Sequence, residues 1–496
     1  MATMSPPTAF ADIYRLLKGT RMEDSNVRLF IGGKWRSTAE TLSIINPATE
    51  QVSGAVCVAQ AHDLDDAVDA ASTGFKVWSA TSPADRAAML LRAAAILRER
   101  SDAIARDITI ENGKTISEAR LEVQRGCEFF EWDAGEAVRH YGRVIPSKAG
   151  IRYIVVHEPI GPVVGFAPWN FPMSQPARKI AGALAAGCSI ILKSSEETPS
   201  GAIHIARAFA DAGLPPGVLN LVFGIPEMIS SNLIPRPEIR GVAFTGSTAV
   251  GKHLTAMAAH HMKPALMELG GHAPVIVCDD ADPVQAGVTS ALRKYRNAGQ
   301  VCTSPTRFYV AEDLYERFID SFTQTALALR VGNGLEDGVD MGPVANDRRV
   351  AALEELADDG LARGARVLFG GKRLKTAGYF FPPTALAEVP VDAKVMNDEP
   401  FGPLAVINPV SSLKEAIDCA NSLPVGLAAY GFTKSSANAD ELMRGLQAGN
   451  ISINTLEASV AETPFGGVKD SGLGREGGAE GLHHYTVVKT ISHQIN

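Results

Sequence analysis

The sequence contains little cysteine, and its 6 cysteines include no C-x-x-C pair. Such sparse, unpaired cysteines indicate neither a disulfide framework nor a zinc site. The formal net charge is −8 and no basic block interrupts the chain, so the electrostatic footprint of nucleic-acid binding is missing. We therefore expect a protein of a reducing compartment, the cytoplasm, without a metal ion and without a nucleic-acid partner.

A long apolar segment is missing as well. The longest strongly apolar stretch covers residues 180–192 and is interrupted by two glycines, which makes it too short to cross a bilayer. The N-terminus has no basic segment followed by an apolar core, so it does not resemble a secretory signal. Residues 1–26 are polar and irregular, and we interpret them as a flexible arm.

Two local elements are predicted near the start of the chain. Residues 30–35 have the pattern of a hairpin. Ser82, followed by Pro83 and by Asp85, is typical of a helix cap, and the apolar spacing after it predicts a helix as far as Arg100.

Further along, strand-like and helical patterns alternate. This alternation predicts parallel strands with crossover helices, and hence a doubly wound α/β sheet with ligands at the carboxyl ends of its strands. A second α/β block is expected over residues 273–454. The strand-like runs of the first block are 163–167, 189–192, 219–223 and 241–244, with a helical pattern at 202–212.

Cys302 lies in a polar, glycine-containing segment, residues 297–304, directly after a helical pattern, whereas Cys57, Cys188 and Cys278 lie in apolar runs. A cysteine in an apolar run is usually an inert hydrophobic residue, but one in a polar loop ionises and meets electrophiles more readily. The pattern alone leaves two interpretations of Cys302 open, a nucleophile and a structural thiol.

Two further polar residues follow strand-like runs. Glu268 closes an apolar run and precedes Gly270 and Gly271, so a desolvated Glu268 would be a general base, and a solvated one only a charge at a strand end. Asn170 lies between Pro168 and Pro172. An amide held in such a rigid turn either donates to an oxyanion or satisfies the turn itself.

Two glycine motifs suggest phosphate binding. Residues 246–252 read G-x-x-x-x-G-K between a strand and a helix, whose free N-terminal amides favour a phosphate. The next residue is His253, however, where a P-loop needs a hydroxyl for Mg²⁺. Residues 472–477 read G-x-G-x-x-G but follow no strand, and we interpret them as a structural loop.

These motifs occur in a characteristic order. The Asn170 turn, the 246–252 loop, the Glu268-Leu269-Gly270-Gly271 segment and the Gly299-Gln300-Val301-Cys302 loop follow one another as in the aldehyde dehydrogenase superfamily. Residues 399–403 (Glu-Pro-Phe-Gly-Pro) and 464–469 (Pro-Phe-Gly-Gly-Val-Lys) match it too. Over residues 30–493 the chain resembles this superfamily, and most of all its succinate-semialdehyde dehydrogenase subfamily.

The resemblance implies an α/β subunit made of a Rossmann-type cofactor domain, an α/β catalytic domain and a small β oligomerisation element, assembled as a homodimer or homotetramer without membrane contact. It places the NAD(P)-binding domain at 1–140 and 159–267, the catalytic domain at 268–455, the oligomerisation element at 141–158 and 482–496, and a return segment at 456–481.

The resemblance also implies oxidation of an aldehyde to a carboxylic acid. The Cys302 thiolate attacks the aldehyde, and Asn170 and the Cys302 backbone N–H hold the oxyanion. The thiohemiacetal then gives a hydride to the nicotinamide and becomes a thioester, which water activated by Glu268 hydrolyses. Lys179 and Glu476 are expected to complete a proton-exit path.

For the cofactor, the resemblance places Lys193 and Glu196 at the adenosine ribose, Ser247 at the pyrophosphate and Glu399 at the nicotinamide ribose. We expect NAD to be preferred, with NADP as the alternative, because Glu196 would repel a 2′-phosphate. Ser194 departs from the proline common after this lysine. The remaining cofactor contacts are expected from Trp169, Gly246, Gly270 and Phe401.

For the substrate, Arg178 and Arg296 match the carboxylate-binding arginines of the subfamily, and Ser459 is a further candidate. Paired guanidinium groups suit a carboxylate, so the prediction is a short ω-carboxy semialdehyde such as succinic semialdehyde. A broad-specificity or aromatic aldehyde dehydrogenase, with these arginines in structural ion pairs, is the alternative. Ser304 stands where some members have a second cysteine, which excludes a disulfide with Cys302.

Two rival functions come from other classes, a P-loop phosphotransferase and a structural homologue that has lost its activity. His253 disfavours the first, because it cannot replace the hydroxyl that binds Mg²⁺. The presence of Cys302, Glu268 and Asn170 together disfavours the second.

Overall fold

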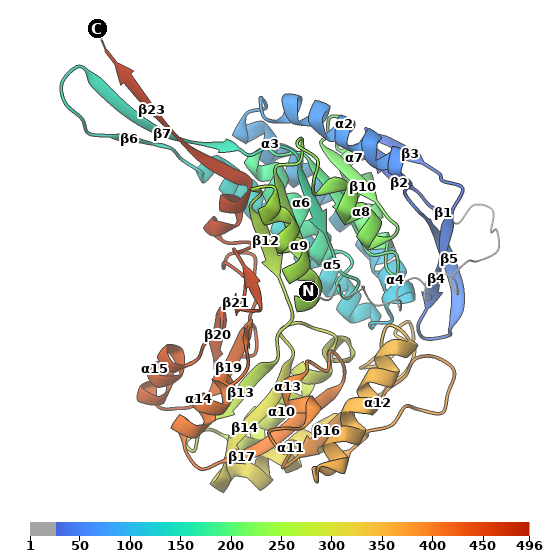
Figure 1. Cartoon of the computed structure of the whole chain (residues 1–496). Helices are drawn as coiled ribbons and strands as arrows, with labels where there is room; N and C mark the ends of the chain where they lie inside the picture. The colour runs from blue at the N-terminus through green and yellow to red at the C-terminus, as the bar shows by residue number, and fades with distance from the viewer. Residues whose placement is uncertain (1–25, 496) are drawn as a thin grey trace, which may run out of the picture.

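The computed structural model describes residues 26–495, which fold around two sheets (Figure 1). The predicted flexible arm lies outside the described residues, apart from residue 26. In spatial order the first sheet has eight strands: β22 (Gly472–Leu473), β12 (Ala265–Glu268), β11 (Gly241–Thr245), β8 (Val163–Phe166), β9 (Ile190–Lys193), β10 (Leu219–Val222), β2 (Leu29–Ile31) and β3 (Lys34–Arg36).

The five central strands of this sheet, from β12 to β10, are parallel, and β22 and β2 flank them in antiparallel register. Helices cover the sheet, so the inner strands are buried and read as nearly continuous apolar runs. This confirms the predicted doubly wound α/β architecture. The helices that precede, connect and follow these strands are α2 (Ala61–Trp78), α3 (Pro83–Glu99), α4 (Ser101–Asn112), α5 (Ile116–Arg139), α6 (Ser174–Ala186), α7 (Ser200–Asp211), α8 (Pro226–Leu233) and α9 (Thr248–His260).

The local predictions for the start of the chain are confirmed. The hairpin is formed by β2 and β3, which pair in antiparallel register. Helix α3 begins after Ser82, whose hydroxyl accepts a hydrogen bond from the Asp85 backbone N–H at 3.2 Å. This bond satisfies one of the amides that a helix start leaves unpaired.

The second sheet forms the other half of the molecule. Its strands are parallel except for β15 at one edge. In spatial order they are β15 (Arg366–Phe369), β16 (Thr384–Ala387), β17 (Leu404–Val410), β14 (Pro305–Ala311), β13 (Ala273–Val277), β19 (Ala428–Phe432) and β20 (Asn450–Ile453). Its helices are α10 (Pro283–Tyr295), α11 (Tyr315–Leu327), α12 (Asp347–Ala362), α13 (Lys394–Asn397), α14 (Leu413–Asn421) and α15 (Ser436–Gly445).

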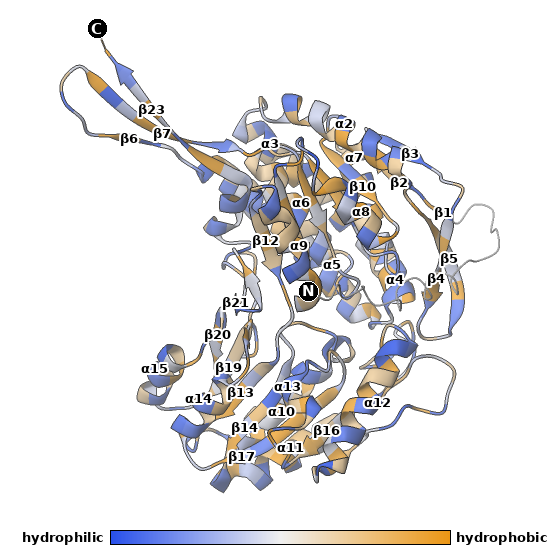
Figure 2. Ribbon diagram, in the orientation of Figure 1, coloured by the Kyte–Doolittle hydropathy of each residue, from blue (hydrophilic) through white to orange (hydrophobic). Residues whose placement is uncertain are grey.

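Each sheet has its own apolar core. One core draws almost all of its residues from 29–269, and the other lies within 273–458. Figure 2 shows the corresponding apolar colour on the central strands of both halves. The chain passes from the first core to the second directly after Glu268, so the residues around it lie where the two halves meet.

A three-stranded antiparallel arm projects from the first half (Figure 1). It consists of β6 (Arg143–Ile145), β7 (Ile151–Pro159) and β23 (Thr486–Gln494). Residues 482–485, predicted as the start of this element, belong instead to the 3-10 helix η3 (Ala479–Tyr485). There Tyr485 is buried against Gly182 of α6, so the arm begins only at Thr486.

The remaining strands form two small sheets, one of β1 (Asn26–Val27), β5 (Gln51–Cys57) and β4 (Thr41–Asn46), the other of β18 (Val425–Gly426) and β21 (Val468–Lys469). Between residues 26 and 495, no helix is both long and apolar enough to cross a membrane. All six cysteines are free thiols.

Candidate active site

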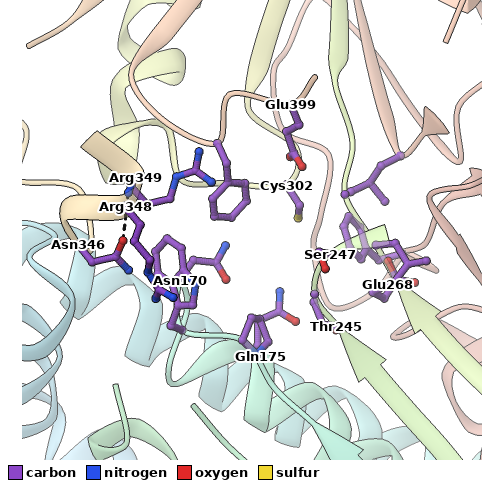
Figure 3. Close-up of a pocket in the computed structure, with 18 residues that line it drawn as sticks. Asn170, Gln175, Thr245, Ser247, Glu268, Cys302, Asn346, Arg348, Arg349 and Glu399 are labelled. Atoms are coloured by element: carbon purple, nitrogen blue, oxygen red, sulfur yellow. Dashed lines mark hydrogen bonds between the residues drawn. The ribbon is translucent and has the colours of Figure 1, made fainter. Parts of the chain in front are cut away.

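A cavity of about 460 Å³ opens at the carboxyl ends of the central strands β8, β11 and β12. This is where an open parallel sheet binds ligands. Figure 3 shows the Cys302 thiol among side chains from both halves of the molecule. The predicted residues that line the cavity are Trp169, Asn170, Gly246, Ser247, Glu268, Gly270, Cys302, Glu399 and Phe401.

A second cavity, about 60 Å³, adjoins the first. Cys302, Gln175 and Phe465 line both of them. The predicted substrate residues Arg178, Arg296 and Ser459 line only the second cavity. The thiol therefore lies at the junction of two separate binding spaces.

The loop before Cys302 has an unusual backbone. Asn297 and Ala298 have φ values of 51° and 50°, a region that non-glycine residues seldom adopt. Gly299 follows with φ 70°, and a Cβ atom there would lie 2.1 Å from the Gly402 carbonyl oxygen. Such local strain persists only where surrounding contacts enforce it, and it is frequent at functional sites. This turn directs Cys302 into the cavity.

The protonation state of Cys302 differs from the sequence expectation. The polar residues of its loop are buried in the fold, so polarity in the sequence did not mean exposure to water. Burial raises the pKa of the Cys302 thiol to about 12, and the carboxyl groups of Glu399 and Glu268 raise it further, while Arg178 and the Cys302 backbone N–H lower it. In this arrangement the thiol is protonated at neutral pH.

Three side chains hold the turn that carries Asn170. The Asn170 side-chain amide donates to the Gln300 carbonyl at 3.0 Å, and the Asn170 carbonyl accepts from Lys114 Nζ at 2.9 Å and Asn297 Nδ2 at 3.1 Å. Lys114 is ion-paired with Glu122, and each side chain is only 1% exposed. An amide nitrogen carries two hydrogens, so Asn170 keeps a second donor.

Glu268 is buried at the end of β12, with an exposed fraction of 3%. Neither of its carboxyl oxygens has a hydrogen-bond partner among the described residues. Burial raises its pKa well above the ordinary value, Glu476 raises it further, and Lys179, Arg178 and Arg475 lower it. The interpretation of Glu268 as a solvated strand-end charge is therefore wrong.

Lys179 and Glu476 lie together, although they line neither cavity. Lys179 Nζ donates to Glu476 Oε1 at 2.9 Å and to Thr245 Oγ1 at 2.7 Å. Both side chains are at most 3% exposed. Thr245 ends β11 beside Glu268 on β12, so this pair lies directly behind the general-base candidate.

The larger cavity has features that fit a dinucleotide. Ser247 is the N-cap of α9, and its side chain makes no capping bond, so free backbone amides face a phosphate position. Gly270 lets the Glu399 carboxyl approach the backbone at the cavity wall, because a Cβ atom there would lie 2.7 Å from Glu399 Oε2. The rings of Trp169 and Phe401 pack edge to face, with their centroids 5.5 Å apart. These residues fit a flat ring and a diphosphate.

Two predicted cofactor residues do not line this cavity. Lys193 at the end of β9 is ion-paired with Glu196 at 2.5 Å. The backbone N–H of Ala167 donates to the Lys193 carbonyl, so both residues lie beside the strand that leads to the Asn170 turn. The departure at Ser194 places a buried hydroxyl between them.

Arg349 lines the larger cavity and was not predicted from the sequence. Arg349 donates to the Pro400 carbonyl at 3.0 Å and so holds the loop that carries Glu399 and Phe401. Burial raises the pKa of Glu399 to about 8, while the Gly271 backbone N–H and Arg349 lower it. Arg349 belongs to no motif, and only its place at the start of α12 behind the Asn346 cap brings it here.

The smaller cavity contains four guanidinium groups and three phenyl rings. Arg178 Nη2 donates to Ser459 Oγ at 2.5 Å, whereas Arg296 has no hydrogen bond or ion pair from its guanidinium to any residue between 26 and 495. Burial lowers the pKa of Arg296 to about 10, and Arg293 lowers it further. The lining residues that sequence reasoning missed include Arg125, Arg293, Phe129, Phe171 and Phe465.

Apart from Gly246 and Ser247, the residues of the two glycine motifs line neither cavity. Lys252, the lysine of the P-loop-like motif, is ion-paired with Asp470 at 2.6 Å and lines neither cavity. Gly472 and Leu473 form β22 and pair with β12. In the part of the chain that the structure describes, no cluster of three or more His, Cys, Asp or Glu side chains is arranged to hold a metal ion.

A family model, curated relatives and solved structures all resemble this chain over most of its length. The model of the "Aldehyde dehydrogenase family" matches residues 35–491. A 4-(hydroxymethyl)benzenesulfonate dehydrogenase of Comamonas testosteroni is 45% identical over 93% of this chain and 97% of its own. The NADP⁺ succinate-semialdehyde dehydrogenase GabD of Escherichia coli (strain K12) is 38% identical over 95% of this chain and 98% of its own. The crystal structure of a Burkholderia pseudomallei succinate-semialdehyde dehydrogenase has a TM-score of 0.93 at 39% identity, covering 95% of this chain and 98% of the other.

Proposed function

From the premise that this chain belongs to the aldehyde dehydrogenase family, we propose that its substrate is a short aldehyde with an anionic group at the far end, with succinic semialdehyde as the leading candidate. Its reaction is the NAD(P)-dependent oxidation of an aldehyde to a carboxylic acid. The observation that carries the proposal is the position of Cys302 between a large cavity and a small, arginine-lined one.

We propose the following roles around the reacting carbon. The Cys302 thiol first releases its proton to solvent, and the thiolate then attacks the aldehyde carbon. The free N–H of Asn170 and the backbone N–H of Cys302 stabilise the oxyanion of the thiohemiacetal. When bound, the nicotinamide ring of the cofactor supplies the hydride acceptor. Glu268 then takes a proton from the water that cleaves the thioester, and Glu476 with Lys179 passes that proton on.

The proposed cofactor contacts are divided between the cavity and the end of β9. Ser247 and Gly246 would face the diphosphate, Glu399 a ribose and Trp169 with Phe401 a ring. Lys193 and Glu196 would meet the adenosine ribose. Glu196 supports a preference for NAD, because its carboxylate accepts bonds from ribose hydroxyls and repels a 2′-phosphate.

We expect kcat/KM to be higher with NAD than with NADP, by a modest factor because Lys193 is ion-paired with Glu196 and offsets part of its charge. Replacing Glu196 by Gln should shift the ratio toward NADP by about tenfold or less. The check is steady-state kinetics with both cofactors on the parent and the variant. A parent enzyme that favours NADP would contradict this assignment, and the E. coli relative, whose name specifies NADP⁺, is a suitable reference.

The anionic substrate is supported by the charge balance of the small cavity. Arg125 is ion-paired with Glu457, and Glu122 is neutralised by Lys114. Arg296 is half-buried, and no carboxylate among residues 26–495 is hydrogen-bonded to it. Its guanidinium lies 5.6 Å from the Phe171 ring centroid. A cation removed from water in this way is costly without an anion to meet it.

Replacing Arg296 by Ala should raise KM for succinic semialdehyde by the equivalent of about 2–4 kcal/mol of lost binding. KM for butanal, which has no anionic group, should change much less. Both constants are measured on the parent and the variant at saturating NAD. If the parent turns over butanal or an aromatic aldehyde with equal or better kcat/KM, the arginines are structural and the substrate proposal fails.

A sulfonate is the second candidate for the anionic group. Four guanidinium groups and three phenyl rings line the small cavity, and the Comamonas testosteroni relative is named for an aromatic sulfonate. Guanidinium groups bind sulfonate oxygens by the same charge-assisted hydrogen bonds as carboxylate oxygens. Including 3-sulfopropanal beside succinic semialdehyde in the same kinetic panel compares the two anions at equal chain length.

The proposed domain limits follow the two cores, with NAD(P) bound by 1–140 and 159–267 and catalysis carried by 268–455. We also propose that the chain forms homodimers or homotetramers through its arm. The arm exposes apolar side chains on all three strands, among them Val144, Tyr153, Val488 and Ile491, and Figure 2 shows apolar colour along it. The six free thiols support a reducing compartment such as the cytoplasm.

A further inference from the structure

Arg178 is enclosed in a way that differs from the other arginines of the small cavity. Its exposed fraction is 7%. Its guanidinium lies 4.0 Å from the Phe129 ring centroid and 5.0 Å from that of Phe465. One nitrogen, Nη2, donates to Ser459, and the other, Nη1, is buried without a partner among residues 26–495. Among residues 26–495, no carboxylate is hydrogen-bonded to this cation.

The charges that face Arg178 are carboxyl groups of the catalytic region. Its pKa is lowered by burial, and Glu476, Glu268, Asp133 and Cys302 act in the opposite direction, in that order. Three of these groups carry buried oxygens without partners: both oxygens of Glu268, Glu476 Oε2 and Asp133 Oδ1. Arg178 therefore acts on three buried carboxyl groups, each of which has at least one oxygen without a hydrogen-bond partner among residues 26–495.

The backbone brings Arg178 and Glu268 to opposite sides of one short pairing. Phe465 and Glu476 form a bridge, with hydrogen bonds of 2.7 and 2.8 Å between their backbones. A Cβ atom on Gly466, next to Phe465, would lie 2.7 Å from Glu268 Oε1. A Cβ atom on Gly477, next to Glu476, would lie 3.4 Å from Arg178 Nη1. The two glycines keep both charged groups close to this bridge.

The other cations near Glu268 have partners of their own. Lys179 donates to Glu476 and Thr245. Arg475 donates to the carbonyls of Gly467 and Gly474 and is partly exposed. The Glu476 carboxyl opposes the ionisation of Glu268. Of the three cations that act on Glu268, Arg178 is the one that is buried and has no hydrogen-bonded carboxylate among residues 26–495.

We infer that Arg178 is a positioning residue for thioester hydrolysis, because its charge keeps Glu268 available as a base, in addition to any contact with the substrate's anionic group. This inference rests on the proposed role of Glu268. It distinguishes two of the four arginines of the small cavity: Arg296 acts on the substrate, and Arg178 acts mainly through the carboxyl groups behind the thiol. Without Arg178 the Glu268 carboxyl holds its proton to higher pH.

The test uses butanal, an uncharged aldehyde, so that binding of an anionic group plays no part. The steady-state rate after the first turnover is followed with NAD between about pH 6.5 and about pH 9. For Arg178→Gln we expect the ratio of kcat at the high pH to kcat at the low pH to rise at least about threefold. Arg178→Lys, which keeps the charge, should restore most of the parent profile. Arg86→Gln is the matched control, because Arg86 is a buried arginine that lines neither cavity, and it should leave the profile with butanal unchanged.

A parent-like pH profile in folded Arg178→Gln would overturn the inference. Arg178→Met, whose unbranched side chain packs well between Phe129 and Phe465, serves as a second neutral variant if thermal melting shows that the glutamine variant is unfolded. In the Glu268→Gln background, adding Arg178→Gln should cause no further change in the profile. If Glu268→Gln alone hydrolyses the thioester at the parent rate, the proposed role of Glu268 fails, and this outcome is distinct from a failure of Arg178.

Discussion

Replacing Cys302 by alanine should reduce aldehyde-dependent NADH production by roughly a thousandfold or more. The sulfur forms the only covalent bond between enzyme and substrate in the proposed reaction, and without it no thiohemiacetal forms. Binding of NAD should be retained, because the cofactor contacts come from other side chains. NADH production is followed by absorbance, and NAD binding by fluorescence titration.

The matched control is Cys419→Ala. Cys419 is the other cysteine that is not fully buried, and it lines neither cavity. Its replacement should leave the rate within a factor of about two, because it changes no group near the reacting carbon. A Cys302→Ala enzyme with substantial NADH production, or a Cys419→Ala enzyme without any, would show that the nucleophile is assigned to the wrong residue.

Replacing Glu268 by glutamine should slow steady-state turnover by about a hundredfold or more while leaving the first turnover largely intact. Cys302 attack and oxidation of the thiohemiacetal do not need the Glu268 carboxyl, but hydrolysis of the thioester needs a base. Rapid-mixing experiments should therefore show a burst of NADH close to one equivalent per active site, followed by a slow phase. This time course of NADH production distinguishes a defect in thioester hydrolysis from a loss of substrate or cofactor binding.

Glu111→Gln makes the same substitution at a carboxyl whose pKa burial also raises, to about 8. Glu111 accepts a hydrogen bond from the Ser200 backbone N–H at 2.9 Å and lines neither cavity. We expect no separation of burst and slow phase in this variant. If Glu268→Gln has a parent-like slow phase, or loses the burst as well, the base is another group.

The parts of the fold that sequence patterns predicted are those determined by local rules. The strands of the first sheet are covered on both faces, so they appear as unbroken apolar runs, and Ser82 marks the start of α3 by its own capping bond. The residues at the carboxyl ends of these strands, Asn170 and Glu268, could be placed near one another for the same reason. Topology alone brings strand ends to one edge of a sheet.

The small cavity could not be predicted in this way. Arg125 on α5 donates to the Ser459 carbonyl, a contact between residues 334 positions apart, and Arg293 comes from α10. No periodicity links a helix in one half of the molecule to a loop that returns from the other half. Lys114 likewise donates a hydrogen bond to the Asn170 carbonyl, and its buried ion pair is with Glu122. No sequence motif marks these contacts.

The burial of the loop that carries Cys302 could not be predicted from the residue types either. Polar residues around Cys302 suggested a solvated loop, yet they bond to one another and to Asn170, and the strained turn at Asn297 and Ala298 encloses them. Loss of water, rather than the residue types in the loop, determines the pKa of the thiol. Only the three-dimensional packing decides which polar segments water reaches.

The most direct measurement of the central claim is the location of the covalent intermediate. Glu268→Gln is mixed with succinic semialdehyde and NAD, quenched in acid during the slow phase, digested and analysed by mass spectrometry. We predict a succinyl group on the peptide that contains Cys302, and no such adduct in the Cys302→Ala enzyme treated in the same way. Burst production of NADH with an unmodified Cys302 peptide, or with the acyl group on another residue, would contradict oxidation through a Cys302 thioester.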